Sequence, residues 1–311
     1  MADAWVTGAR GYIGRHAARE LANRGHRVHG IGHGAWVQPD REAAGVSSWL
    51  NSGVTAAGLD VLAGQVGLPS VILHLAGGSM VGASIAAPRE DFERTVTASA
   101  ELVEWVRTRA PTTPIVAASR AAVYGVGWDR PIPADAAVRP CSPYGAHKAA
   151  METVLAGYAR SFGIRVAIVR LFSVYGAGLE KQFIWDLCCR LAGAGAELQI
   201  DGTGDETRDF VYASDAAFML ASAAEHASAE MPVFNGGTGD PVTMASLAGR
   251  LAAAWPSSCA LRFSGRVRKG DPRHLIADMR ASAVIAPPTF VSLDAGIARA
   301  VEVARARLGR T

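Results

Sequence analysis

Residues 5–14 read WVTGARGYIG and lie close to the start of the chain. The apolar residues 4–6 at the front of this stretch predict a short buried strand. Residues 15–24 behind it have helical spacing, and Gly25 follows as a stop signal. The glycines therefore lie between a strand and a helix, which is the context that a dinucleotide-binding turn requires.

Each glycine of this turn has a physical reason to be there. Gly8 permits a tight turn, Gly11 lets the backbone approach a pyrophosphate, and Gly14 lets the helix pack closely on the sheet. Phosphate groups would then meet free backbone N–H groups at the N-terminus of the helix. The turn therefore predicts a dinucleotide site at the first strand.

The composition excludes several other classes of protein. The chain has 311 residues, of which 50% are hydrophobic, and its net charge is only +3. Such a weak charge gives no field that would favour nucleic acid, and no apolar run is long enough to predict a membrane span. The first strand begins too early to leave room for a signal peptide. The cysteines have no zinc spacing, so we expect reduced thiols, no metal site and a cytoplasmic location; they are Cys141, Cys188, Cys189 and Cys259.

Strands and helices are expected to alternate along the first half of the chain. Residues 28–31 predict a second strand, and residues 71–78 form a continuous apolar run of the kind found in parallel sheets. Residues 91–108 predict a long helix, and residues 114–119 predict a fifth strand. This alternation predicts an α/β fold with a Rossmann-type, doubly wound parallel sheet.

The end of the second strand bears on the choice between NAD and NADP. An acid that binds the ribose of NAD usually lies there, about 20 residues after the glycines, but this chain has Gly32. No carboxylate would repel a 2′-phosphate, and Arg10, His33 or Arg41 could reach it. We therefore expect NAD or NADP as cofactor, with NADP tolerated.

Residues 142–152 carry the reactive groups. Tyr144 and Lys148 are four residues apart on a predicted helix, so their side chains share one face. A phenol has a pKa of about 10, and an ammonium group beside it favours the phenolate. The pair is therefore a candidate general acid and base next to a hydride carrier.

The glycine turn and the Tyr144–Lys148 pair together resemble the extended short-chain dehydrogenases/reductases, in particular the nucleotide-sugar epimerase/dehydratase family. Residues 170–176, 201–212, 234–239 and 268–273 resemble later segments of that family. The resemblance implies a Rossmann domain over residues 1–175, to which residues 207–237 return. It also implies a smaller substrate domain over residues 176–311 and a homodimer formed through the helix of Tyr144 and Lys148.

The resemblance and the local patterns together give a set of expected site residues. Residues 59–61 are expected to end a third strand, where an Asp of the family meets the adenine. The expected cofactor-binding residues are Gly8, Arg10, Gly11, Tyr12, Ile13, Gly14, His33, Asp60, Val61, Leu75, Ala76, Gly77, Tyr144 and Lys148. The expected contacts to a nucleotide-sugar substrate are Ser173, Arg208, Arg268 and Asp271.

The chain departs from the family pattern at the fifth strand. The family has a Ser or Thr where this chain has Arg120, and Ser119 lies one residue earlier. Three alternatives are open: Ser119 enters the site through a shifted strand end, Arg120 stabilises an oxyanion, or Arg120 binds an anionic group of the substrate. Ala121 and Ala122 replace the Asp-Glu pair of the 4,6-dehydratases, which argues against dehydration.

The resemblance implies a nucleotide-sugar 4-epimerase that works through a 4-keto intermediate. One alternative is an NADPH-dependent reductase of 4-keto sugars, which the missing ribose acid at Gly32 favours. A second alternative is a binding module without catalysis, which the replacement at Arg120 keeps open.

Overall fold

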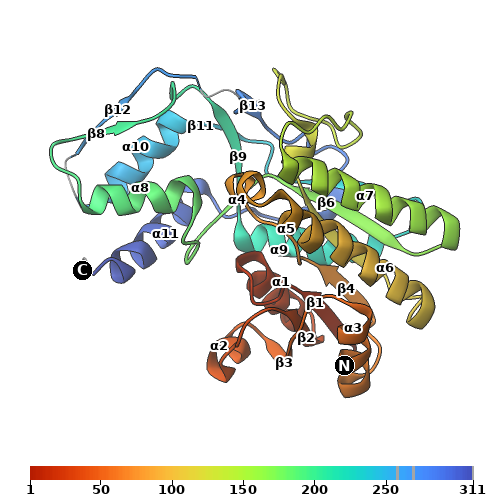
Figure 1. Ribbon diagram of the computed structural model, residues 1–311. Coiled ribbons are helices and arrows are strands. Elements are labelled where there is room, and N and C mark those ends of the chain that lie inside the picture. The colour runs from red at the N-terminus through yellow and green to blue at the C-terminus, as the bar shows by residue number, and fades with distance from the viewer. Residues whose placement is uncertain (257–258, 268–269, 310–311) are drawn as a thin grey trace.

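The fold was analysed in a computed structural model that describes residues 1–256, 259–267 and 270–309. Its centre is a seven-stranded parallel sheet (Figure 1). In spatial order the strands are β10 (Val233–Gly236), β6 (Val166–Leu171), β5 (Ile115–Arg120), β4 (Val71–His74), β1 (Asp3–Thr7), β2 (Arg27–Gly32) and β3 (Val46–Asn51). The order reverses between β1 and β4, and in such sheets ligands bind at the carboxyl ends of the strands near this point.

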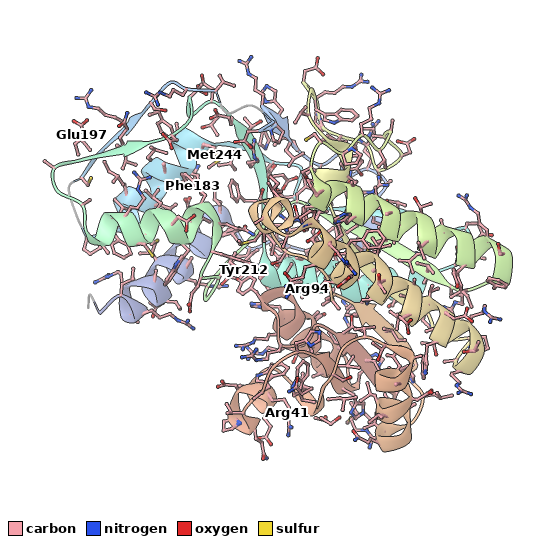
Figure 2. All side chains as sticks on the ribbon, viewed as in Figure 1. Arg41, Arg94, Phe183, Glu197, Tyr212 and Met244 are labelled. Atoms are coloured by element: carbon pink, nitrogen blue, oxygen red, sulfur yellow. The ribbon has the colours of Figure 1, made fainter. Side chains whose placement is uncertain are left out.

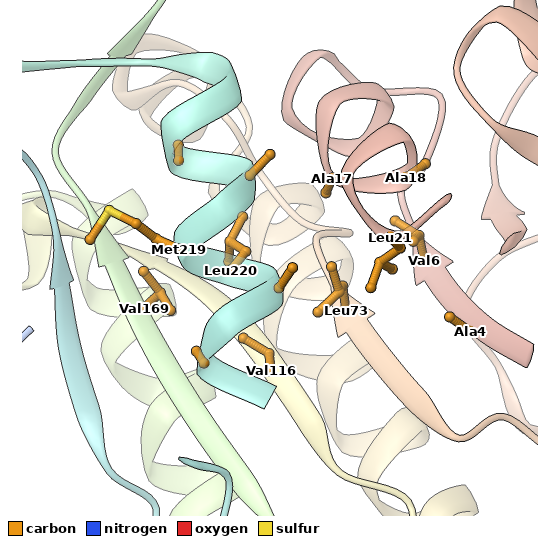
Figure 3. Close-up of a cluster of buried hydrophobic side chains, with 14 of the residues drawn as sticks. Ala4, Val6, Ala17, Ala18, Leu21, Leu73, Val116, Val169, Met219 and Leu220 are labelled. Carbon is orange, nitrogen blue, oxygen red and sulfur yellow. The ribbon is translucent and has the colours of Figure 1, made fainter. Parts of the chain in front are cut away.

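Helices cover both faces of this sheet. One face carries α1 (Tyr12–Asn23) and α9 (Ala213–Ser222). The other carries α3 (Ala56–Val66), α6 (Ala98–Arg109) and α7 (Pro143–Phe162). Neighbouring strand residues serve opposite faces: Val6 packs under α1 and α9, whereas Trp5 packs under α3 and α6. Figure 3 shows the first of these cores, in which small residues such as Ala17 let the helices lie close to the strands.

A smaller unit lies beside the large sheet (Figure 1). Strand β9 (Thr207–Tyr212) pairs with β7 (Ser173–Tyr175), β11 (Pro241–Thr243) and β13 (His274–Leu275), and β8 (Glu197–Ile200) pairs with β12 (Ala260–Phe263). Three helices complete the unit: α8 (Gln182–Ala192), α10 (Met244–Ala254) and α11 (Leu293–Arg307). Phe183 on α8 and Met244 on α10 lie against its core (Figure 2).

Short segments fill the connections. They are α2 (Gln38–Ala43), α4 (Val81–Ala86), α5 (Pro88–Phe92), a π-helical turn η1 (Glu93–Thr97) and three 3₁₀ turns, η2 (Ala121–Tyr124), η3 (Ala223–His226) and η4 (Ala283–Ile285). In the described ranges of the chain, no helix is long and apolar enough to cross a membrane.

The chain crosses between the two units more than once. Strand β9 belongs to the smaller unit, whereas α9 and β10, which follow it, belong to the large sheet and its cover. The buried carboxylate of Asp209 holds the crossing together. It accepts hydrogen bonds from the backbone N–H groups of Thr238, Gly239 and Ala277 at 2.7–3.1 Å. The domain boundaries themselves stay a prediction.

Two expectations about local structure are wrong. Residues 59–61 do not end a strand, because they lie inside α3, whose first turn is capped by Thr55 accepting from the N–H of Gly58. The third strand is β3, which buries only Val46 fully and so lacks a clear apolar pattern. The helix expected over residues 91–108 is interrupted by η1, so that it begins as α5 and continues as α6.

Candidate active site

A cavity of about 960 Å³ lies at the carboxyl ends of the central strands. This volume is at the upper end of the range for small-molecule sites, which is roughly 300–1,000 Å³. A second cavity of about 260 Å³ lies in the smaller unit. The two cavities share four lining residues and are therefore neighbours; these residues are Val174, Leu179, Lys181 and Gln182.

The turn after β1 forms one wall of the large cavity. Gly8 has a φ of +69°, and a Cβ at this position would lie 2.9 Å from the backbone nitrogen of Ala76. A Cβ at Gly14 would lie 2.8 Å from the Cα of Ala9 and would collide with the carbonyl oxygen of Gly8. Backbone therefore fills the space that side chains would need, and the turn leaves room for a phosphate group beside the start of α1. These residues fit a dinucleotide.

Where β2 ends, no acidic residue of the described chain lines the large cavity. Gly32 and His33 line it there, together with Arg10, whereas Arg41 is not among the lining residues. Asp60 and Val61 do not line it either.

Asp60 instead contacts two residues of α6 and does not line the cavity. Its carboxylate accepts from the indole N–H of Trp105 at 2.8 Å and lies 3.4 Å from Arg109. The residues that line the cavity after β3 are Gly53, Val54 and Thr55, which our sequence reasoning missed. The Ser-Gly turn ahead of the capping Thr55 is the signal that would have located them.

A buried network fixes the end of β4 against the glycine turn. The hydroxyl of Thr7 accepts from the N–H groups of Leu75 and Ala76, both at 3.1 Å, and lies 2.7 Å from Nδ1 of His74. His74 is fully buried, and burial lowers its pKa to about 3. The imidazole is therefore neutral at ordinary pH and serves as a brace. Leu75, Ala76 and Gly77 line the cavity, as the small residues in the sequence predict.

The π-helical turn η1 contributes to the same wall. The hydroxyl of Thr95 accepts from the N–H of Gly78 at 2.9 Å. Thr95 thus lies against the loop after β4. π-Helical turns such as η1 are frequent at functional sites. The interruption of the expected helix thus has a role in shaping the site.

Tyr144 and Lys148 lie on one face of α7 and line the large cavity. The helix starts at Ser142, whose hydroxyl accepts from the N–H of Gly145 at 3.2 Å. Lys148 donates from Nζ to the carbonyl oxygen of Ala118 at 3.0 Å. Burial, together with the charge of Arg120, lowers the pKa of Lys148 to about 8.

The electrostatics around Tyr144 differ from the expectation that Lys148 lowers its pKa. Burial raises the pKa of Tyr144, and the cation that acts against this rise is Arg120. Tyr144 is almost completely buried, so desolvation outweighs the neighbouring positive charge. The part that Lys148 plays in lowering this pKa stays a prediction.

Ser119 and Arg120 both line the large cavity. Ser119 is fully buried, and its hydroxyl has no hydrogen-bond partner among the described residues. Arg120 ends β5 and remains partly exposed. The structure thus brings both candidates for the missing hydroxyl position to the same place as Tyr144 and Lys148.

Three of the four expected substrate residues line the second cavity: Ser173, Arg208 and Asp271. Arg208 and Asp271 form an ion pair at 2.9 Å, with the Arg208 side chain only 13% exposed. The fourth residue, Arg268, lies outside the described residues.

Comparison with known proteins identifies the family. A model of the NAD dependent epimerase/dehydratase family matches residues 4–237. The chain belongs to this family. As an epimerase/dehydratase it is an enzyme that works with a nicotinamide dinucleotide, and the resemblance and the Rossmann-type fold expected from the sequence are both confirmed.

Individual members of the epimerase/dehydratase family resemble the whole chain. A UDP-glucose 4-epimerase from Corynebacterium glutamicum is 28% identical over 290 residues, which cover 88% of this chain and 86% of that protein. A probable UDP-glucuronate 4-epimerase from Rhizobium meliloti is 27% identical, with 96% of this chain and 95% of that protein covered. The solved structure of MoeE5 in complex with UDP-glucuronic acid and NAD is 29% identical, with a TM-score of 0.84 and 98% and 99% coverage.

The glycine turn gives a direct test of the cofactor site. In Gly14→Ala the new methyl group meets backbone atoms that cannot move aside without opening the turn, so we expect nicotinamide nucleotide binding to weaken at least about tenfold, which is about 1.4 kcal/mol. The matched control is Gly64→Ala, another helical glycine, where nothing lies within 4 Å of the new methyl group. Isothermal titration with NADH should show normal binding for the control; equal affinities of both variants would contradict the role of Gly14.

The buried ammonium of Lys148 predicts a pH dependence of stability. Its pKa of about 8 in the folded protein lies below the ordinary 10.5, so folding disfavours the charged form. This cost is fully present below pH 8 and disappears as the pH rises through 10.5. Lys148→Met should therefore raise the free energy of unfolding at pH 7 by up to about 3 kcal/mol, at about 1.4 kcal/mol per pKa unit. Urea unfolding without added nucleotide should show this gain shrinking between pH 8 and 10; parallel pH profiles would refute it.

Proposed function

We propose that the protein is a nucleotide-sugar 4-epimerase that works through a transient 4-keto intermediate with NAD or NADP bound. The observation that carries the proposal is the position of Tyr144 and Lys148. They line the cavity that the glycine turn shapes for a dinucleotide, beside a second cavity lined by Arg208 and Asp271. The relatives from Corynebacterium glutamicum and Rhizobium meliloti bear 4-epimerase names, which supports the same reaction.

In this mechanism Tyr144 exchanges a proton with the C4 hydroxyl of the sugar. The phenolate accepts the hydroxyl proton when C4 is oxidised, and the phenol returns it when the ketone is reduced from the opposite face. The bound nicotinamide supplies the hydride acceptor and donor for these two half-reactions. Arg120 provides positive charge that favours the phenolate against the desolvation at Tyr144.

Substrate and cofactor would be held by separate groups. The diphosphate of the nucleotide sugar is assigned to Arg208 with Ser173, because a guanidinium fork suits paired phosphate oxygens. Asp271 is available to a nucleotide ribose once its ion pair with Arg208 is shared with the ligand. The missing acid at Gly32, with Arg10 and His33 close by, supports tolerance of NADP.

A second candidate is the NADPH-dependent reduction of a 4-keto sugar. The wall at the end of β2 favours it, because Gly32 leaves the ribose diol of NAD without its usual carboxylate partner. Tyr144 would then protonate the C4 oxygen once per turnover, and the resulting phenolate would be reprotonated from solvent.

Cofactor retention separates the two candidates. The protein is purified without added nucleotide and denatured, and the released nucleotide is identified by mass. An epimerase regenerates its cofactor in every turnover, so we expect stoichiometric nicotinamide nucleotide and interconversion of C4 epimers with no net change at 340 nm. A protein that is purified empty and consumes NADPH with a 4-keto nucleotide sugar would instead establish the reductase.

Tyr144→Phe tests the acid–base group. Removal of the hydroxyl leaves the ring that fills the site, so the fold and nucleotide binding should persist while kcat falls by at least about 100-fold, the lower end of the range for general acid–base catalysis. Stopped epimerisation assays with UDP-sugars and TDP-sugars give kcat, and titration with NADH serves as the binding control. Turnover within tenfold of the unmodified protein would exclude Tyr144 from proton transfer.

The proposal includes a homodimer formed through α7 in the cytoplasm. Small residues on α7, among them Ala149 and Ala156, permit another helix to approach closely, and the four cysteines form no disulfide in the structure. Sedimentation of the purified protein as a monomer would remove the dimer from the proposal.

A further inference from the structure

Two basic side chains line the large cavity, and one of them also lines the second cavity. Arg120 lies at the end of β5 and lines the large cavity, and Lys181, at the start of α8, lines both cavities. Lys181 donates from Nζ to the hydroxyl of Ser79 at 3.0 Å. Within residues 1–256, 259–267 and 270–309, neither Arg120 nor Lys181 forms an ion pair with a carboxylate.

The carboxylates that line the large cavity are engaged elsewhere. Glu90 pairs with Arg94, and Glu93 pairs with Arg89 at 3.0 Å. Glu101 accepts from the N–H of Ala56 at the start of α3, 2.9 Å away. Asp91, behind the wall, is bound to His147 at 2.6 Å. In the second cavity, Glu206 accepts from the N–H groups of Thr203 and Gly204, and Asp271 pairs with Arg208. These carboxylates are thus bound to groups other than Arg120 and Lys181.

The charges of this cluster act on one another. Burial, with a contribution from Arg120, lowers the pKa of Lys181 below its ordinary value, and Arg120 acts in the same direction on Lys148. Like charges held this close repel each other unless an anion lies between them. A bound anionic group would remove this repulsion.

The backbone beside Lys181 is also unusual. Gln182 has a φ of +70°, in the left-handed region that residues other than glycine rarely adopt. Gln182 lines both cavities and begins α8 directly after Lys181. Such conformations concentrate at ligand sites, where the surrounding structure holds them in place.

We propose that Arg120 and Lys181, with Ser79, form a subsite for a carboxylate on the sugar ring, so that the substrate is an acidic nucleotide sugar. This inference rests on the proposed function and names the substrate class of the same site. The other anions are assigned to other groups: phosphates of the cofactor to the glycine turn, and the substrate diphosphate to Arg208. Arg120 lines the same cavity as Tyr144 and Lys148, so an anion that Arg120 binds there belongs to the part of the substrate beside the reactive groups.

The chemistry of arginine fits this role better than that of the hydroxyl it replaces. A serine or threonine hydroxyl is neutral and can both donate and accept one bond at a sugar oxygen. A guanidinium is permanently charged, only donates, and presents two parallel N–H groups that match a carboxylate. Ser119, fully buried with its hydroxyl unpaired in the described structure, remains available for the neutral role.

The test compares two substrates that differ only at C6, UDP-glucuronate and UDP-glucose, with the corresponding TDP-sugars measured alongside. The unmodified protein should have at least tenfold higher kcat/KM for the uronate. Arg120→Ser should lower turnover of both sugars, because it removes positive charge near Tyr144, but it should lower kcat/KM for the uronate by about 10- to 100-fold more than for glucose, the range for hydrogen bonds to a charged group. Lys181→Gln should lower the uronate value by about tenfold.

Three further measurements keep the test decisive. Arg250→Ser removes an arginine of an exposed pair with Asp294 in the smaller unit and should leave the ratio unchanged. Ser119→Ala should lower turnover of both sugars equally, without altering their ratio. Dissociation constants of both sugars, measured with NAD present, show whether Arg120 acts in binding even in a variant that turns over slowly.

The outcomes separate this inference from the proposed function. Preference for the neutral sugar, or equal losses for both sugars in Arg120→Ser, overturns the carboxylate subsite while epimerisation stands. Tighter binding of the uronate that depends on Arg120, without interconversion of epimers, supports the subsite and overturns the epimerase. Equal binding of the two sugars, or binding of neither, overturns the subsite.

Discussion

The close contact between the first turn and the end of β4 is the constraint on which the rest of the site depends. The Cα of Gly8 lies so close to the backbone of Ala76 that no side chain fits between them, and Gly14 abuts the same turn from the other side. The hydroxyl of Thr7 bonds the N–H groups of Leu75 and Ala76, which fixes the two strand ends at one separation. This packing leaves backbone N–H groups at the base of the cavity and places every later element relative to them.

Burial, more than any single charge, determines the chemistry of the reactive groups. Tyr144 and Lys148 are both nearly inaccessible to solvent, and burial shifts their pKa values in opposite directions, toward the neutral form in each case. Because burial favours the neutral form of each residue, Tyr144 and Lys148 alone do not form a stable phenolate–ammonium ion pair. In the proposed mechanism, the phenolate therefore needs additional positive charge near Tyr144, and Arg120 is the cation that lowers the pKa of Tyr144.

The sequence predicted those parts of the fold whose residues carry a local pattern. The strand before Gly8, the helix of Tyr144 and Lys148 and the apolar run that becomes β4 are all of this kind, since each has its period and its end signals within a few residues. Strand β3 was missed because it lies at the edge of the sheet and buries only Val46 fully, while Trp49 and Leu50 pack against the cores with partial exposure. Asp60 was misplaced for the same reason.

Contacts between distant segments could not be predicted. Lys181 and Ser79 are 102 residues apart, and nothing in either segment indicates that they meet. The direction of the pKa shift at Tyr144 also depends on how completely the folded chain excludes water, which spacing alone does not reveal. The sequence showed that Arg120 departs from the family pattern, but it did not show that Lys181 lies near Arg120 in the folded chain.

One neighbour of Arg120 is Lys181, a second cation that lines the same cavity. If Arg120 alone held a substrate carboxylate, that negative charge would cancel the field that Arg120 exerts on Tyr144 and would push the phenol further from ionisation. Lys181 removes this conflict, because it can share the carboxylate while Arg120 keeps part of its charge directed at Tyr144. In the proposed mechanism, substrate selection and proton transfer thus draw on one cluster of positive charge, and changing either member of it is expected to alter both.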